Sequence, residues 1–194
     1  MGVIQQAGTR GSLKWIQRLV NARADLLDPQ LRDALGFEGP VQWLSPLQAE
    51  GFREYRDQKA LDQLRVSLPV EPLSDFWPAR GPRWDALARA GEALILVEAK
   101  AHIHELFSTE CQAKSPTSRA KIRKALDRAQ TALGAKPGLD WMLRFYQYAN
   151  RLAHLHFRAC MRCSWTFAGS KRWSCREGIG GALSSAVESG FQGW

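Results

Sequence analysis

Residues 76–102, FWPARGPRWDALARAGEALILVEAKAH, decide how the rest of the chain is organised. Within this stretch, residues 94–97 form a short and purely apolar run, which predicts a strand buried on both faces. The same strand runs on into Glu98 and Lys100. Ionisable side chains at the end of a buried strand are costly to bury unless they have partners, so they indicate a functional site.

The preceding segment, residues 83–90, is expected to be the other arm of a hairpin. If Gly91 and Glu92 are the central residues of a type II′ turn, Asp85 lies directly opposite Glu98. Any hairpin loop with an even number of residues keeps these two carboxylates on one face, because side chains alternate with a period of two. Lys100 shares that face, so two acids and an ammonium group should converge at one edge of the sheet.

Two carboxylates held close together repel each other, and a divalent cation is the usual relief. Oxygen ligands of this kind suit Mg²⁺, which keeps several waters and takes one or two carboxylates. The hairpin therefore predicts a magnesium site, which Mn²⁺ could also occupy.

These residues carry a family resemblance. Asp85, followed after twelve residues by Glu98-Ala99-Lys100, resembles the Asp…Glu-x-Lys motif of the PD-(D/E)xK nuclease superfamily. The wider pattern WPxRGPxWDAL at residues 77–87, with LVEAKAH at residues 96–102, is similar to a group of bacterial proteins in that superfamily. The resemblance implies an α/β fold with a restriction-endonuclease-like core, a mixed β-sheet flanked by helices, and a helical N-terminal part.

The resemblance also implies roles for the hairpin residues. Asp85 and Glu98 would bind the metal, helped by the carbonyl of Ala99. Lys100 would position or activate the attacking water and stabilise charge on the phosphate.

Two further elements of the superfamily have candidates here. A helix before the sheet often supplies a third acid to the metal, for which Glu54 is the first candidate and Glu50 the second. A glutamine on a helix after the catalytic strand often assists the site, and Gln147 matches that element.

The overall charge suits a polyanionic partner. The 194 residues carry a formal net charge of +8, with 27 Lys and Arg against 19 Asp and Glu. This balance is consistent with binding nucleic acid, and DNA in particular. The side chains expected to contact it lie near the motif or on a basic helix: Arg80, Arg83, His102, Lys121 and Lys124.

Composition narrows the class of protein. The chain is 45% hydrophobic and long enough to bury a core. It shows neither a run long enough to span a membrane nor a signal-peptide core, which predicts a cytoplasmic protein. A single core of this type cuts one strand at a time. The sequence does not determine the oligomeric state, and a homodimer is one alternative.

Local signals predict helices over much of the remaining chain. An apolar stripe begins after Ser12 and is interrupted at Asp28-Pro29, and a second short helix ends at Gly36. Ser45, Pro46 and Gln48 form a capping box that predicts a helix to about residue 65. A strand is expected near residues 73–77, and helices are expected over residues 115–133 and 141–155.

These elements suggest one nuclease-like domain, residues 1–157, with a helical lead-in (1–68), a catalytic hairpin (73–104) and helices (115–157). Residues 158–194 are different: they are rich in Gly, Ser and Cys and lack the apolar strand that this core needs. One interpretation is a Cys₃His zinc site made by His156, Cys160, Cys163 and Cys175. The other interpretation is a shifted reading frame, with which the protein could lack activity.

Three functional classes follow. The first is a metal-dependent endonuclease that hydrolyses phosphodiester bonds in DNA. The second is a module that keeps the fold and binds nucleic acid without cutting it. The third is a metal-dependent hydrolase acting on a small phosphate ester.

Overall fold

The computed structural model describes residues 2–65, 72–91, 93–102, 105, 107–135, 138–159, 163–166 and 172–174. For residues 158, 159, 163–166 and 172–174 it describes the backbone alone. This part of the chain is a mixture of helices and small sheets, which agrees with the predicted α/β class. None of the described helices is both long and apolar enough to cross a bilayer.

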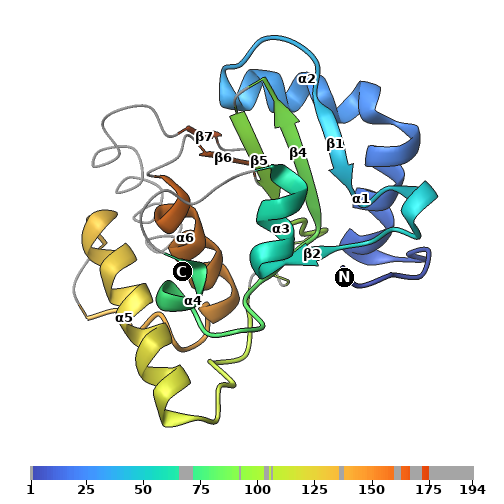
Figure 1. Ribbon diagram of the computed structural model, residues 1–194. Coiled ribbons are helices and arrows are strands. Elements are labelled where there is room, and N and C mark those ends of the chain that lie inside the picture. The colour runs from blue at the N-terminus through green and yellow to red at the C-terminus, as the bar shows by residue number, and fades with distance from the viewer. Residues whose placement is uncertain are drawn as a thin grey trace.

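Helices and strands are interspersed along the chain (Figure 1). The described helices are α1 (Gly11–Ala22), α2 (Ala24–Leu35), η1 (Gln48–Glu50), α3 (Asp57–Leu64), α4 (Leu73–Phe76), α5 (Pro116–Ala132) and α6 (Tyr146–Ala159). The described strands are β1 (Gln42–Ser45), β2 (Tyr55–Arg56), β3 (Arg83–Trp84), β4 (Ala86–Ala90), β5 (Ala93–Val97), β6 (Cys163–Thr166) and β7 (Arg172–Ser174).

The larger sheet has the strand order β1-β4-β5-β6-β7. The neighbours of β4, which are β1 and β5, both run antiparallel to it, whereas β6 runs parallel to β5. A second, two-stranded sheet pairs β2 with β3, the strand that bends into β4. The β6 backbone, which follows α6 in the chain, thus lies at the side of β5 opposite to β4.

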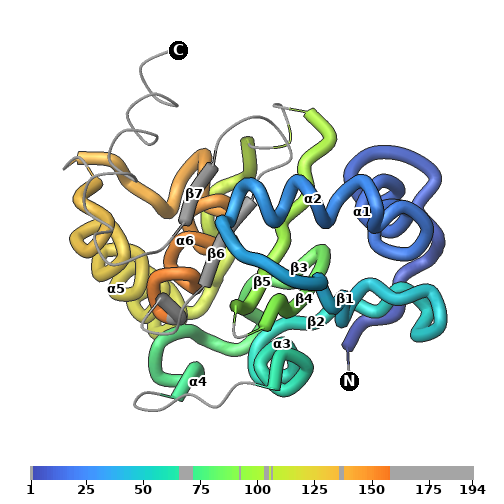
Figure 2. The backbone as a smooth tube through the Cα atoms, turned by 90° about the horizontal axis from the view of Figure 1, so that it is seen from above, coloured from blue at the N-terminus to red at the C-terminus, as the bar shows by residue number. Residues whose placement is uncertain are grey.

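The central strand β5 is buried on both faces, as its apolar run predicts. Leu96 packs in a cluster with Leu87 and the α3 residues Ala60 and Leu64. Ile95, on the opposite face, packs with Leu31 and Leu35 of α2. Figure 1 shows these two helices on either side of the sheet, and Figure 2, which is seen from above, shows the same arrangement.

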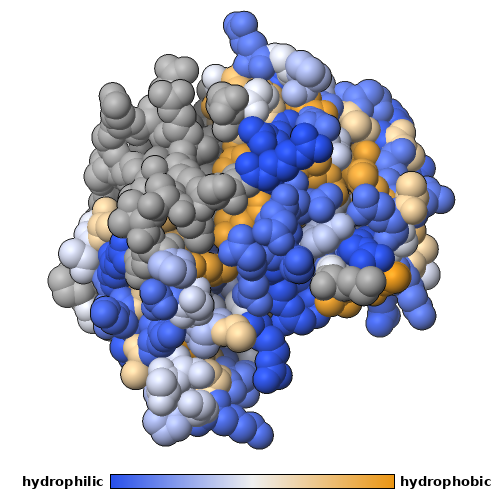
Figure 3. Space-filling model, viewed as in Figure 1, coloured by the Kyte–Doolittle hydropathy of each residue, from blue (hydrophilic) through white to orange (hydrophobic). Residues whose placement is uncertain are grey.

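A separate apolar cluster joins the last two long helices. Ile122, Leu126 and Ala129 of α5 pack against Leu152 and Ala153 of α6. The Ser115 hydroxyl accepts a hydrogen bond from the Ser118 N–H and so caps α5, as the local sequence predicts. In this arrangement α6 lies between α5 and the sheet (Figure 1). The surface in that view is mostly hydrophilic, with apolar side chains showing along the sheet (Figure 3).

The helix predicted from the capping box at Ser45 is wrong. Ser45 is the fully buried last residue of β1 and pairs with Leu87 of β4. The chain then makes the short helix η1, turns at Gly51 and forms β2, so that α3 begins only at Asp57. Burying Tyr55 beside its partner Trp84 in the two-stranded sheet outweighs the local helix signal.

Three other boundaries also differ from the predictions. Residues 73–76 form one helical turn, α4, because Leu73 and Phe76 are buried in the α5–α6 cluster rather than paired in a sheet. Helix α2 continues through Pro29, and the break between the first two helices falls at Arg23. Helix α6 begins at Tyr146 rather than at residue 141, while the αL residue Gly36 ends α2 as predicted.

Candidate active site

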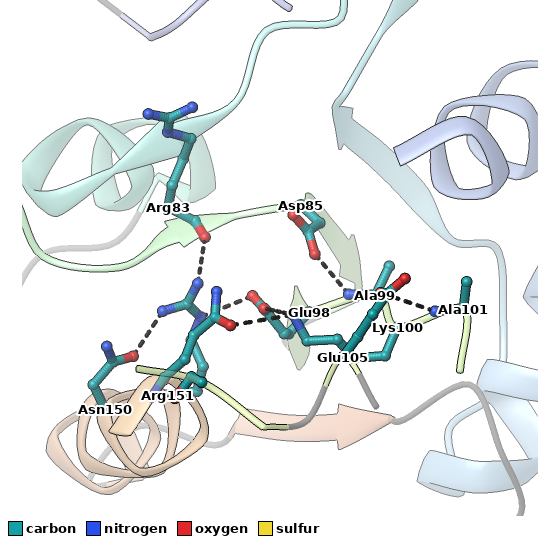
Figure 4. Close-up of polar contacts among 11 residues, drawn as sticks. Arg83, Asp85, Glu98, Ala99, Lys100, Ala101, Glu105, Asn150 and Arg151 are labelled. Carbon is teal, nitrogen blue, oxygen red and sulfur yellow. Dashed lines mark hydrogen bonds and ion pairs between the residues drawn. The ribbon is translucent and has the colours of Figure 1, made fainter. Parts of the chain in front are cut away.

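Strand pairing brings Asp85 next to Glu98, as the hairpin parity predicts. The ladder between β4 and β5 runs from Ala90↔Ala93 to Ala86↔Val97. One residue further on, the Asp85 N–H donates to the Val97 carbonyl (3.0 Å). The Oδ2 atom of Asp85 accepts a hydrogen bond from the Ala99 N–H (2.7 Å), so this carboxylate lies against the backbone that follows β5 (Figure 4). Glu92, the second residue assigned to the turn, lies outside the described residues.

The surroundings of Asp85 disfavour its charge. Burial, followed by the nearby negative charge of Glu98, raises the pKa of Asp85 to about 7. The charge of Glu54 acts in the same direction, whereas the Ala99 N–H and Lys100 lower this pKa. A carboxyl group that neighbours two other acids and holds its proton near neutral pH fits a site that receives a cation.

Glu98 is buried and contacts two cationic side chains. Its Oε1 atom lies 2.6 Å from the Nζ atom of Lys100. Its Oε2 atom accepts a hydrogen bond from the Nε atom of Arg151 on α6 (2.8 Å). The predicted convergence of acid and ammonium at the end of β5 is therefore present, with a guanidinium added (Figure 4).

Helix α6 brings Gln147 into the same cluster. The Nζ atom of Lys100 lies 3.4 Å from the Gln147 side-chain oxygen. The Gln147 N–H donates to the Ser108 hydroxyl (2.9 Å), which attaches the first turn of α6 to the loop before α5. The residue chosen from the sequence as a helper thus contacts the candidate catalytic lysine.

Glu54 lies close enough to influence Asp85, although it is on an extended segment rather than a helix. It pairs with Val3 in an isolated bridge directly before β2. Its Oε2 atom accepts from the side chain of Gln5 (2.8 Å) and lies 3.6 Å from the Arg83 guanidinium. Burial raises the pKa of Glu54, and the Gln5 hydrogen bond and Arg83 oppose that rise. The alternative acid, Glu50, instead accepts a hydrogen bond from the Tyr55 hydroxyl (3.0 Å).

The residues expected to contact nucleic acid fall into two groups. Arg80, Arg83 and His102 lie on the segments that flank Asp85 and Glu98; Arg80 is exposed, and His102 is paired with Glu105 (3.4 Å). Lys121 and Lys124 are on α5, which packs on α6 rather than on the sheet. The Nζ atom of Lys121 donates to the Ser74 carbonyl (2.8 Å), so this side chain joins α5 to α4. The structure therefore does not bring these two lysines to the carboxylates.

A metal would have to be held by a small set of protein ligands. Within the described ranges, no three His, Cys, Asp or Glu side chains are disposed to hold an ion together. Asp85 and Glu98 with the Ala99 carbonyl still form an all-oxygen set, and Mg²⁺ needs only one or two carboxylates. Of the proposed zinc ligands, Cys160 and Cys175 lie outside the described residues and Cys163 is described by its backbone alone.

Arg151 also belongs to this site, although no role was predicted for it from the sequence. Its side chain is 6% exposed, and it contacts Glu98, the Asn150 side chain and the Arg83 carbonyl. One signal was present in the sequence. Arg151 follows Gln147 by four residues, so the two share a face of a helix.

Comparison with known proteins yields no relative. No protein-family model matches the chain, and no curated protein or solved structure matches it. Its function is therefore argued from the geometry and chemistry of the Asp85–Glu98 site.

Proposed function

We propose that the chain is a metal-dependent nuclease of the PD-(D/E)xK type, with a restriction-endonuclease-like core, that hydrolyses phosphodiester bonds in DNA. One observation carries the proposal. The Asp85 carboxylate is held against the Ala99 N–H (2.7 Å) beside Glu98, whose own carboxylate contacts Lys100 (2.6 Å). This is the set of groups, on the hairpin, that the superfamily motif implies.

The donor set fits Mg²⁺ or Mn²⁺. Asp85, Glu98 and the Ala99 carbonyl would hold the ion, and waters and substrate phosphate oxygens would complete its shell. When bound, the ion neutralises charge on the phosphate and makes a water more nucleophilic. The raised pKa of Asp85 supports a cation here, because it reflects burial first and then the negative charges of Glu98 and Glu54, all of which a bound cation would offset.

The protein's own groups supply positioning and charge. Lys100, with its side chain 17% exposed, can direct an N–H to the attacking water or to a phosphate oxygen. Gln147 provides an acceptor that orients this ammonium. The exposed Arg80, just before β3, can contact a neighbouring phosphate of the same strand.

A second candidate, a nucleic-acid-binding module without activity, is favoured by one observation. Both oxygens of Glu98 already contact cations, Lys100 on one side and Arg151 on the other. A site that keeps this arrangement would have no need of a metal. Such a binder would show salt-dependent affinity for DNA and neither cleavage nor a Mg²⁺ requirement.

Cleavage assays on the full chain separate the two. The nuclease should degrade plasmid or linear DNA with Mg²⁺ and not with EDTA. We expect D85N, E98Q and K100A each to lower the rate by about 100-fold or more. The matched controls D25N and K59A alter exposed ion-pair residues away from the site and should retain the wild-type rate. Equal cleavage by wild type and D85N would refute the nuclease; cleavage of a nucleotide monoester but not of DNA would indicate a small-ester hydrolase.

A further inference from the structure

Arg151 is held in place far more firmly than an ordinary surface arginine. Its Nε donates to the Oε2 atom of Glu98 (2.8 Å), one terminal nitrogen donates to the Asn150 side-chain oxygen (2.7 Å) and the other to the Arg83 carbonyl (3.0 Å). The guanidinium also lies over the ring of Trp84, 5.3 Å from its centroid. Three directed hydrogen bonds from one planar group fix its orientation as well as its position.

The second cation on Glu98 is held differently. Lys100 contacts Oε1 of Glu98 through a single ammonium group on a flexible stem. Gln147 offers that ammonium another acceptor 3.4 Å away. Lys100 can therefore leave Oε1 without losing every partner, whereas Arg151 would give up three hydrogen bonds in a buried position.

We propose that Arg151 is the positioning residue of the candidate metal site: it retains Oε2 of Glu98 and so reserves Oε1 for the metal. Lys100 contacts Oε1 in this structure and would move toward Gln147 on metal binding. The same guanidinium also donates to the Arg83 carbonyl, two residues before Asp85. Arg151 therefore also sets the distance between the segment that carries Asp85 and the segment that carries Glu98. This inference rests on the proposed function, since it assigns a role around the same two carboxylates.

The test measures Mn²⁺ binding by electron paramagnetic resonance, with the metal alone and no DNA. Arg151→Lys keeps the charge but cannot reach Glu98, Asn150 and the Arg83 carbonyl together. We expect its Mn²⁺ dissociation constant to rise about 10-fold or more, the usual effect of losing a group that orients a ligand. Arg123→Lys is the matched control, because Arg123 on α5 makes a paired contact with the Asp140 carboxylate (2.8 and 3.1 Å) rather than with Glu98. This control should bind Mn²⁺ as the wild type does.

A folded Arg151→Lys protein that binds Mn²⁺ within twofold of the wild type would overturn the inference, whatever its thermal stability. If that variant does not fold, Asn150→Ala replaces it, because it leaves Arg151 in place but removes the 2.7 Å contact that orients the guanidinium. An unchanged Mn²⁺ constant in folded Asn150→Ala would likewise count against the role. DNA cleavage by the wild type tests the proposed function separately. Mn²⁺ binding without cleavage would refute the proposed nuclease activity but would not contradict the role of Arg151.

Discussion

Asp85 is the residue whose environment departs most from what its charge requires. Its carboxylate is buried beside Glu98, and the Ala99 N–H and the charge of Lys100 favour its ionised form without offsetting that burial. Its pKa of about 7 lies well above the value of 3.8 of an unperturbed aspartate. This difference makes the stability of the fold depend on pH in a direction opposite to that of most aspartates.

The sign follows from proton binding. Between about pH 4 and pH 7 the folded protein keeps a proton on Asp85 that the unfolded chain has already lost, so stability falls as pH rises through this window and levels off above it. A shift of this size corresponds to a destabilisation on the order of a few kcal/mol at pH 8. D85N has no such proton to lose. Urea unfolding without added metal should therefore show D85N as more stable than the wild type at pH 8, with the difference shrinking as the pH falls to about 4.

Adding Mg²⁺ provides the control for this effect. An ion that binds the ionised carboxylates should stabilise the wild type at pH 8 and leave D85N nearly unchanged. A wild-type protein that is as stable as D85N at pH 8 without metal would contradict the raised pKa.

At the scale of elements, Asp57 connects the start of α3 to the loop that leads into β3. Its two carboxylate oxygens accept hydrogen bonds from the Arg80 N–H (3.1 Å) and the Gly81 N–H (2.8 Å). A methyl group at Gly81 would come within 2.7 Å of this carboxylate, so the loop approaches too closely for any larger residue. The approach to Asp85 is thus fixed from a helix that precedes it by more than twenty residues.

Removing this connection should be costly. Asp57→Ala leaves two backbone N–H groups without their acceptor, and we expect it to lower the free energy of unfolding by about 1–3 kcal/mol in urea titrations. Asp62→Ala changes an exposed acid on the same helix and should alter stability by less than about 0.5 kcal/mol. Equal effects of the two substitutions would show that the loop does not depend on Asp57.

Gly91 gives the hairpin its tight turn. Its φ of +56° lies in the left-handed region, and a methyl group there would meet no atom within 4 Å. Gly91→Ala should therefore lower the free energy of unfolding by about 1 kcal/mol through backbone conformation alone. Thermal unfolding measures this loss, and an unchanged melting temperature would contradict it.

The hairpin could be predicted from the sequence because its information is local. An apolar run, a glycine and a period of two determine which side chains share a face, and the register from Ala90↔Ala93 to Ala86↔Val97 follows. The segment around Glu54 could not be predicted in the same way. Its extended form depends on burying Tyr55 against Trp84, residues that are neighbours only in the folded chain.

The same distinction holds within the site. Asp85, Glu98 and Lys100 follow from one motif, and Gln147 follows from the family resemblance. The role of Arg151 depends on a contact with a residue 53 positions earlier, which no local pattern encodes. Gln147, 47 positions from Lys100, could be found because the family resemblance marks it, whereas nothing in the sequence marks Arg151 as a partner of Glu98.

At the scale of the whole molecule, the net charge of +8 predicts a strong dependence of DNA affinity on salt. Arg80→Ala removes an exposed charge near the site and should reduce the slope of log affinity against log salt by about 1. Lys124→Ala removes the same charge from α5 and should change the slope less. Fluorescence anisotropy between about 50 and 200 mM salt, with EDTA present, measures both. A larger effect of Lys124→Ala would place the DNA across α5 instead.

The contact between Arg151 and Glu98 has a consequence for how the protein is made. A ribosome adds Glu98 to the growing chain 53 residues before Arg151, and the β6 backbone that flanks β5 comes later still. Until α6 is synthesised, the hairpin lacks the guanidinium that contacts Glu98 and the Arg83 carbonyl. The contacts around Glu98 are therefore completed only late in synthesis, after the whole hairpin has been made.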